Sequence, residues 1–147
     1  MKKLLNLLLP AKFKPRHKIT NVELQAFRKL FQMDVKFAAE LAGCTVQSWY
    51  GWERGETPVP DRIGELMDQM QALYIDELAS VEIAVRKHNG RCALRYYETF
   101  ELFAKHNPRR ADLIDWKLSQ VVAARLLGDE EVYLVSAERI EEEACGK

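Results

Sequence analysis

The chain has 147 residues, of which 48% are hydrophobic and 30% are charged, and it carries no net charge at neutral pH. This composition is typical of a folded globular protein and excludes a chain that is disordered throughout. Residues 1–60 hold ten Lys and Arg against five Asp and Glu, whereas residues 61–147 hold twelve against seventeen, so only the first part is suited to an anionic partner.

Residues 1–19 predict a flexible basic arm, with two prolines and seven basic side chains if His17 is included. The opening MKKLLNLLLP is similar to a signal peptide, but its apolar run is too short and no small-residue cleavage site follows. An arm that follows the DNA backbone and a weak membrane anchor are the alternatives. No other stretch approaches the roughly 20 apolar residues that span a bilayer, so we expect a cytoplasmic protein without a membrane partner.

The first helix is predicted from Thr20 to about Phe31. Thr20 and Glu23 have the spacing of a capping box, which satisfies the first free amides of a helix. The apolar residues expected on its buried stripe are Leu24, Phe27, Leu30 and Phe31.

Two shorter helices follow. Asp34 is expected to cap a helix that ends at Gly43, where a left-handed turn needs no Cβ, and Thr45 to cap a helix that stops at Gly55. The prolines within residues 56–60 predict an extended connector. Residues 20–60 therefore form one predicted unit.

Residues 61–137 predict a helical dimerisation domain with a short strand. Its expected elements are a long helix over 61–88, a strand over 92–97, helices over 98–106 and 112–127, and a strand or helix start over 132–136. We expect most of its apolar residues to be core, with the strand at 92–97 pairing across a two-fold axis. Residues 138–147 predict a frayed acidic tail.

Three residues have the spacing of two helices that cross at a tight turn. Ala39 is the small residue at the crossing, Gly43 makes the turn, and Trp49 fills the core. With W-E-R-G at 52–55, residues 20–60 resemble the XRE/Cro-type helix-turn-helix family. The fold class implied is mainly α: a lambda-repressor-like bundle, then a long helix and a small C-terminal α(+β) region.

A second resemblance covers residues 20–130. The segments TNVELQAFRKLF, SWYGWERG, LRYYETFELFAKHNP and IDWKLSQVVAARLL resemble the anti-CRISPR-associated repressors and their uncharacterised bacterial relatives. This resemblance implies a dimer whose N-terminal domains bind an inverted repeat, often upstream of the regulator's own operon. Val35 departs from the XRE pattern, because many such domains have a glutamine there that braces a phosphate.

The third helix is expected to place one face in a major groove. The candidate DNA-binding residues are Lys36, Thr45, Val46, Gln47, Ser48, Tyr50, Gly51 and Arg54. Gln47 can pair with adenine, Tyr50 can contact a thymine methyl or a phosphate, and Gly51 lets the backbones approach. Arg54, Thr45, Ser48 and the helix start beside Lys36 are suited to phosphates.

These assignments have simpler alternatives. Gln47 and Tyr50 can form a solvated helix face without a partner, and Arg54 can form a surface ion pair with Glu53 or Glu56. The cysteines at 44, 92 and 145 are predicted to be reduced thiols, with Cys44 packed in the turn.

We therefore expect a sequence-specific DNA-binding regulator, a dimeric autorepressor. An antitoxin-like protein that also regulates its own operon is the alternative, and an RNA or protein partner stays open. An enzyme is not expected, since the chain lacks a glycine-rich phosphate loop and a histidine with a recognisable catalytic partner. Neither a cofactor nor a metal site is predicted.

Overall fold

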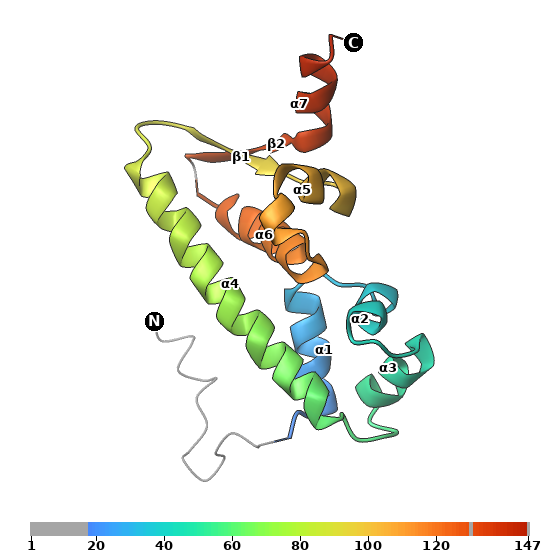
Figure 1. Ribbon diagram of the computed structural model, residues 1–147. Helices are drawn as coiled ribbons and strands as arrows, with labels where there is room; N and C mark the ends of the chain where they lie inside the picture. Colours follow the sequence, from blue (N-terminus) through green and yellow to red (C-terminus); the bar gives the residue numbers. More distant parts are fainter. Residues whose placement is uncertain (1–17, 130, 147) are drawn as a thin grey trace, which may run out of the picture.

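The computed structural model describes residues 18–129 and 131–146, which form a mainly helical protein with one small sheet (Figure 1). Its elements are α1 (Asn21–Leu30), α2 (Val35–Leu41), α3 (Val46–Glu53), α4 (Asp61–Lys87), β1 (Cys92–Tyr96), α5 (Phe100–His106), the 3-10 turn η2 (Pro108–Arg110), α6 (Leu113–Leu126), β2 (Val132–Ser136) and α7 (Ala137–Ala144). The expected fold class is confirmed. The basic arm predicted over residues 1–19 lies outside the described residues, except for Lys18 and Ile19.

The ends of the first three helices are fixed by the residues that the sequence indicated. Thr20 Oγ1 accepts from the Glu23 amide at 3.2 Å, and the Glu23 carboxylate accepts from the Thr20 amide at 2.7 Å. Asp34 and Thr45 cap α2 and α3 with one bond each, accepting from the amides of Phe37 and Ser48. Gly43 has a φ of +61°, the left-handed conformation expected at the end of α2.

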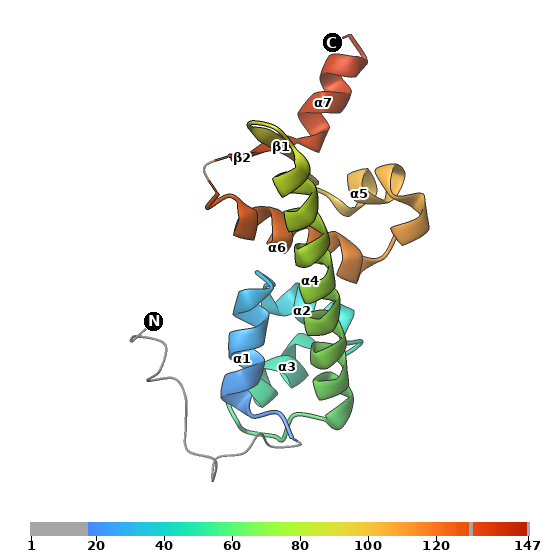
Figure 2. The ribbon, with the colours of Figure 1, turned by 90° about the vertical axis from the view of Figure 1, so that its left-hand side faces the viewer.

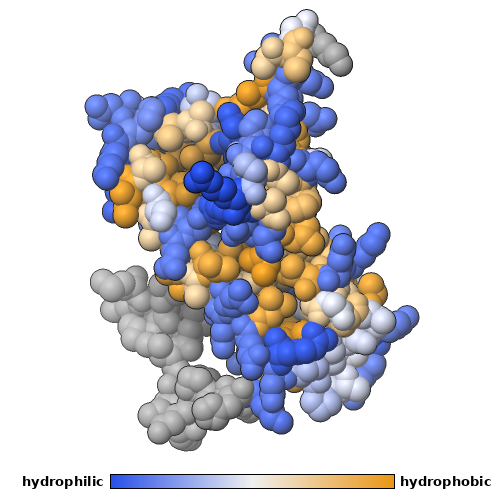
Figure 3. All heavy atoms as spheres, in the orientation of Figure 1, coloured by the Kyte–Doolittle hydropathy of each residue, from blue (hydrophilic) through white to orange (hydrophobic). Residues whose placement is uncertain are grey.

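The long helix α4 runs along most of the molecule and joins its two halves (Figures 1 and 2). Its first turns pack against α1, and its later turns pack beside α6. The first hydrophobic core takes residues from α1, α2, α3, α4 and α6: Leu24, Phe27, Phe31, Met33, Ala38, Ala39, Ala42, Trp49, Trp52, Val59, Ile63, Met67, Met70, Leu118 and Val121. The core of the first 60 residues thus continues into the second half without a gap. Figure 3 shows apolar side chains reaching the surface where α6 meets α1 and α2.

The sheet consists of two parallel strands, β1 and β2, in a register that runs from Cys92 opposite Val132 to Tyr96 opposite Ser136. A second core lies beneath it and contains Val85, Val122, Leu126 and Val132. Residues 132–136 are therefore a strand. The expectation that the strand at 92–97 pairs across a two-fold axis is wrong for the edge that β2 occupies, because the chain supplies its own partner strand.

Two further expectations need correction. Leu30 is 49% exposed, because it lies roughly a quarter of a helical turn from the centre of the stripe formed by Leu24, Phe27 and Phe31. The acidic tail is not frayed over its whole length, since residues 137–144 form α7. Ser136 caps this helix, and the Glu141 carboxylate lies 2.9 Å from Nε2 of His106 and 2.8 Å from Nζ of Lys105.

Candidate nucleic-acid interface

The α2-turn-α3 unit is packed as the sequence pattern predicted. Ala39 and Trp49 are both buried, and their small and large side chains allow the two helices to cross closely. The amide of Cys44 donates to the Ala39 carbonyl at 2.9 Å, which closes the turn around Gly43. The half-buried thiol of Cys44 packs against the first core, and burial raises its pKa.

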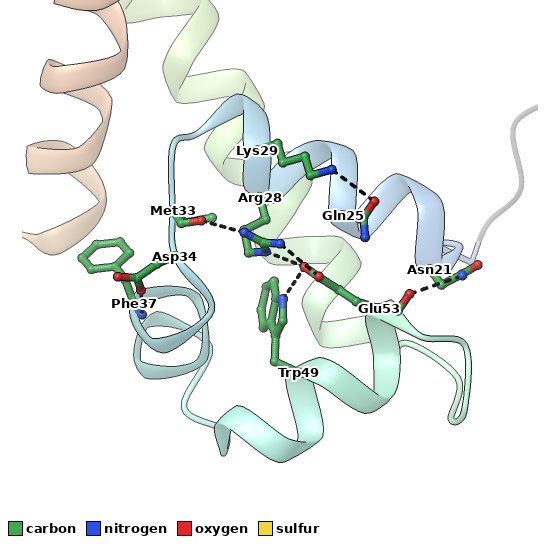
Figure 4. A network of polar contacts seen from close by, with 9 residues as sticks. All are labelled: Asn21, Gln25, Arg28, Lys29, Met33, Asp34, Phe37, Trp49 and Glu53. Atoms are coloured by element: carbon green, nitrogen blue, oxygen red, sulfur yellow. Dashed lines mark hydrogen bonds and ion pairs between the residues drawn. The ribbon is translucent and has the colours of Figure 1, made fainter.

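A polar network beneath α3 fixes that helix against α1 (Figure 4). Glu53 accepts from Nε1 of Trp49 at 2.7 Å and from Nε and Nη2 of Arg28 at 2.6 and 3.1 Å. The same guanidinium donates through Nη1 to the Met33 carbonyl at 3.0 Å, and Asn21 donates to the backbone carbonyl of Glu53 at 3.4 Å. The Glu53 carboxylate thus joins α3 to α1, and the Arg28 guanidinium extends the network to the turn before α2.

Sequence reasoning did not identify this role of Glu53, which it considered only as a partner of Arg54. The available signal was the spacing of four between Trp49 and Glu53, which places both side chains on the inner side of α3. Burial opposes ionisation of Glu53, but the hydrogen bonds from Arg28 and Trp49 outweigh it and hold the pKa of this carboxyl below its ordinary value. Glu53 is therefore a charged, satisfied core residue.

The outer face of α3 carries most of the predicted contact residues. Gln47 is exposed, and Val46 and Tyr50 are 38% and 42% exposed. Thr45 Oγ1 lies 2.9 Å from Ser48 Oγ and also accepts from the Ser48 amide, so these two hydroxyls are partly engaged with one another. A partner can therefore contact the amide of Gln47, the phenol ring of Tyr50 and the side chain of Val46 while the inner side of α3 stays packed.

Gly51 is not open to a partner, which corrects the sequence interpretation. It is buried, and a Cβ placed on it would lie 3.4 Å from Oγ1 of Thr57 and 3.8 Å from a carboxylate oxygen of Glu56. The connector after α3 folds back over this position, so Gly51 is covered by the chain itself rather than by a partner's backbone.

Arg54 lies at the far end of the same face and is already paired. Its Nε and Nη2 donate to the two carboxylate oxygens of Glu56 at 2.7 and 3.1 Å, and its guanidinium lies 5.7 Å from the centre of the Tyr50 ring. The hydrogen bond from Arg54 lowers the pKa of Glu56, and both side chains are more than half exposed. A phosphate that bound the same two nitrogens would displace Glu56 from this guanidinium.

Two lysines lie on or beside α2. Lys36 is exposed in the first turn, as expected. Lys117 belongs to α6 and was not anticipated: its Nζ lies 4.9 Å from the centre of the Phe37 ring and 2.9 Å from Oε1 of Gln120. Burial lowers the pKa of Lys117, and the negative charge of Asp34 opposes this effect. The C-terminal half thus brings a basic side chain against the helix-turn-helix unit.

The described ranges, 18–129 and 131–146, also bear on other kinds of site. These residues contain no group of three or more His, Cys, Asp and Glu side chains that could hold a metal ion. Their three cysteines are free thiols. No helix in this part of the chain combines the length and the apolar character that crossing a membrane requires.

Comparison with known proteins adds evidence of a different kind. Residues 19–134 match the model of the family described as Aca2/YdiL-like. The chain is 38% identical over 108 residues to the protein named "Aca2 repressor" of Pectobacterium phage ZF40, an alignment that covers 72% of this chain and 90% of that protein. It is 31% identical over 106 residues to YdiL of Escherichia coli strain K12, named as an uncharacterised protein, with 71% and 89% covered. The expected resemblance to the anti-CRISPR-associated repressors is confirmed.

Proposed function

We propose that this chain, which belongs to the Aca2/YdiL-like family, is a DNA-binding transcriptional repressor. In this proposal α3 enters the major groove of a short operator, and two copies of the chain bind an inverted repeat upstream of the repressor's own gene. The protein acts in the cytoplasm, by binding and not by catalysis, and needs no cofactor. The name of the phage relative, a repressor, supports the regulatory role.

The main support for the proposal is the division of α3 into two faces. The inner face is held by the network of Trp49, Glu53 and Arg28, while Gln47 and Tyr50 face outward on the other side. A recognition helix needs this combination, because base contacts discriminate only when the helix presenting them is fixed in position.

The size of α3 supports the dimer. Its eight residues span about 12 Å, which is enough for only a few base pairs in the major groove. A second copy held about one DNA turn away supplies the remaining specificity. Exposed apolar side chains of the C-terminal half offer surface for this contact: Ile75, Ile83, Leu127 and Tyr133.

The deciding experiment is fluorescence anisotropy of the purified protein against its own upstream DNA and a scrambled duplex, at physiological salt, with the mass of the free protein measured in parallel. We expect a dimer that binds the upstream DNA tighter by a factor of about 10³ or more. Equally weak binding to both duplexes would contradict autoregulation and direct the search to a distant operator, an RNA or a protein partner. A monomer would contradict the inverted-repeat arrangement.

A further inference from the structure

An open groove separates α1 from the first turns of α4, on the side of α1 that does not carry Arg28. Its volume is about 650 Å³. The buried side chains of Phe27 and Met67 contribute to its lining, and Leu30, which is 49% exposed, stands at its edge. Leu30 leaves apolar surface in water at this edge, and covering it would be favourable.

The chain enters α1 directly beside this groove. Ile19 lines it and packs on Gly64 of α4, where a Cβ would lie only 3.0 Å from Cγ1 of Ile19. Glycine is unfavourable inside a helix, and here it permits the chain to pass close to the α4 backbone. The start of α1 therefore lies at the groove.

The preceding residues have the composition that the groove requires. Residues 4–9 read Leu-Leu-Asn-Leu-Leu-Leu, and nine residues separate them from Ile19. Nine residues can span up to about 30 Å, whereas α1 is about 15 Å long, so this leucine segment can reach any point of the groove.

The charges are complementary as well. Lys2 and Lys3 precede the leucine segment and Lys12 follows it, while the groove is bordered by the carboxylates of Glu23 and Asp68. Asp68 is exposed, and no described residue forms an ion pair with it. An apolar segment flanked by lysines fits an apolar groove with an acidic border.

We propose that residues 4–9 bind in the α1–α4 groove of their own chain. This contact covers Leu30 and ties the basic residues between the segment and Ile19 to the helix-turn-helix unit. The contact lies outside the family match, which covers residues 19–134, and the proposal does not depend on DNA binding.

Photocrosslinking of the full-length protein tests the proposal. p-Benzoylphenylalanine replaces Leu30 at the edge of the groove, and the matched control carries it at Ile83, a 51% exposed position far along α4. We expect irradiation to join position 30 to residues 4–9, with at least a fivefold lower yield from position 83. The same substitution at Gln71, which also lines the groove, replaces the first variant if that one fails to fold. Equal yields from groove and control positions would refute the docking.

Isotope mixing identifies the occupant. Unlabelled and ¹⁵N-labelled chains are unfolded, refolded together and irradiated, and crosslinked peptide pairs of a single isotope composition are expected. Mixed pairs would show that a second copy supplies the segment, which would overturn docking within one chain.

The charge contribution is tested with Asp68→Lys, which we expect to reduce the crosslink yield several-fold. Asp76→Lys, elsewhere on α4, is the control. An unchanged yield for Asp68→Lys would contradict the role of the acidic border.

Discussion

Arg28 of α1 and Glu53 of α3 form a bidentate ion pair, with 2.6 Å between Nε and Oε1 and 3.1 Å between Nη2 and Oε2. Their side chains are only 16% and 6% exposed. The pair joins residues that are 25 positions apart and fixes the angle of α3 against α1, since both bonds of the planar guanidinium must be satisfied together. The orientation of the outer face of α3 follows from this contact.

Glu53→Gln is expected to lower the free energy of unfolding by about 3 kcal/mol, because it leaves the largely buried Arg28 guanidinium without its counter-charge. Urea unfolding of the two proteins measures the difference. Glu56→Gln is the matched control, since it removes the same charge from an exposed pair, and its unfolding midpoint should not change. Equal effects of the two substitutions would contradict a structural role of the buried pair.

The stability contributed by Glu53 depends on pH. Its pKa is lowered in the folded protein, so the folded state binds fewer protons at this carboxyl than the unfolded state does. The contribution is complete above the unfolded pKa of about 4.3 and is lost as the pH falls through the lower folded value. We expect the stability difference between wild type and Glu53→Gln to shrink as the pH is lowered from 6 towards about 3, as followed by urea midpoints. A difference that stays constant over this range would exclude the lowered pKa.

Gln47→Ala is expected to cost about 1 to 3 kcal/mol in binding to the specific operator, with little change in nonspecific binding, because the amide is proposed to read a base edge. Anisotropy titrations with operator and scrambled duplexes measure both. Gln69→Ala removes an exposed glutamine from α4 and serves as the control. Equal losses on both duplexes would refute base reading by Gln47.

Glu56→Gln is expected to tighten DNA binding about threefold to fivefold on any sequence, because it releases the Arg54 guanidinium for a phosphate. The same change in an Arg54→Ala background should have a smaller effect. Affinities at several salt concentrations measure both, and Arg54→Ala alone should reduce the salt slope by about one. If Glu56→Gln acts equally in both backgrounds, Arg54 does not contact phosphate.

Gly51→Ala is expected to leave DNA affinity unchanged and to stabilise the protein by up to about 1 kcal/mol, since alanine is the better helix former and the new Cβ meets Thr57 at an ordinary contact distance. Thermal unfolding and anisotropy measure the two effects. A clear loss of operator affinity without loss of stability would restore the sequence-based interpretation, in which Gly51 faces the DNA.

The sequence by itself determined the local structure of this protein. Thr20, Asp34 and Thr45 mark the helix starts, because a capping side chain bonds to amides only three residues away. Gly43 and Gly55 mark helix ends through their own backbone angles, and the spacing of Ala39 and Trp49 predicted the crossing of α2 and α3. Each of these features depends on residues close together in the chain.

Only the tertiary structure decided which distant residues meet. The partner of Glu53 is Arg28 rather than Arg54, β1 pairs with β2 within the chain, and Lys117 of α6 lies beside Phe37. Gly51 is covered for the same reason, because the connector at Thr57 returns over it. These contacts join segments that are far apart in the sequence. Their relative positions depend on how whole helices pack, which the spacing of residues along the chain does not determine.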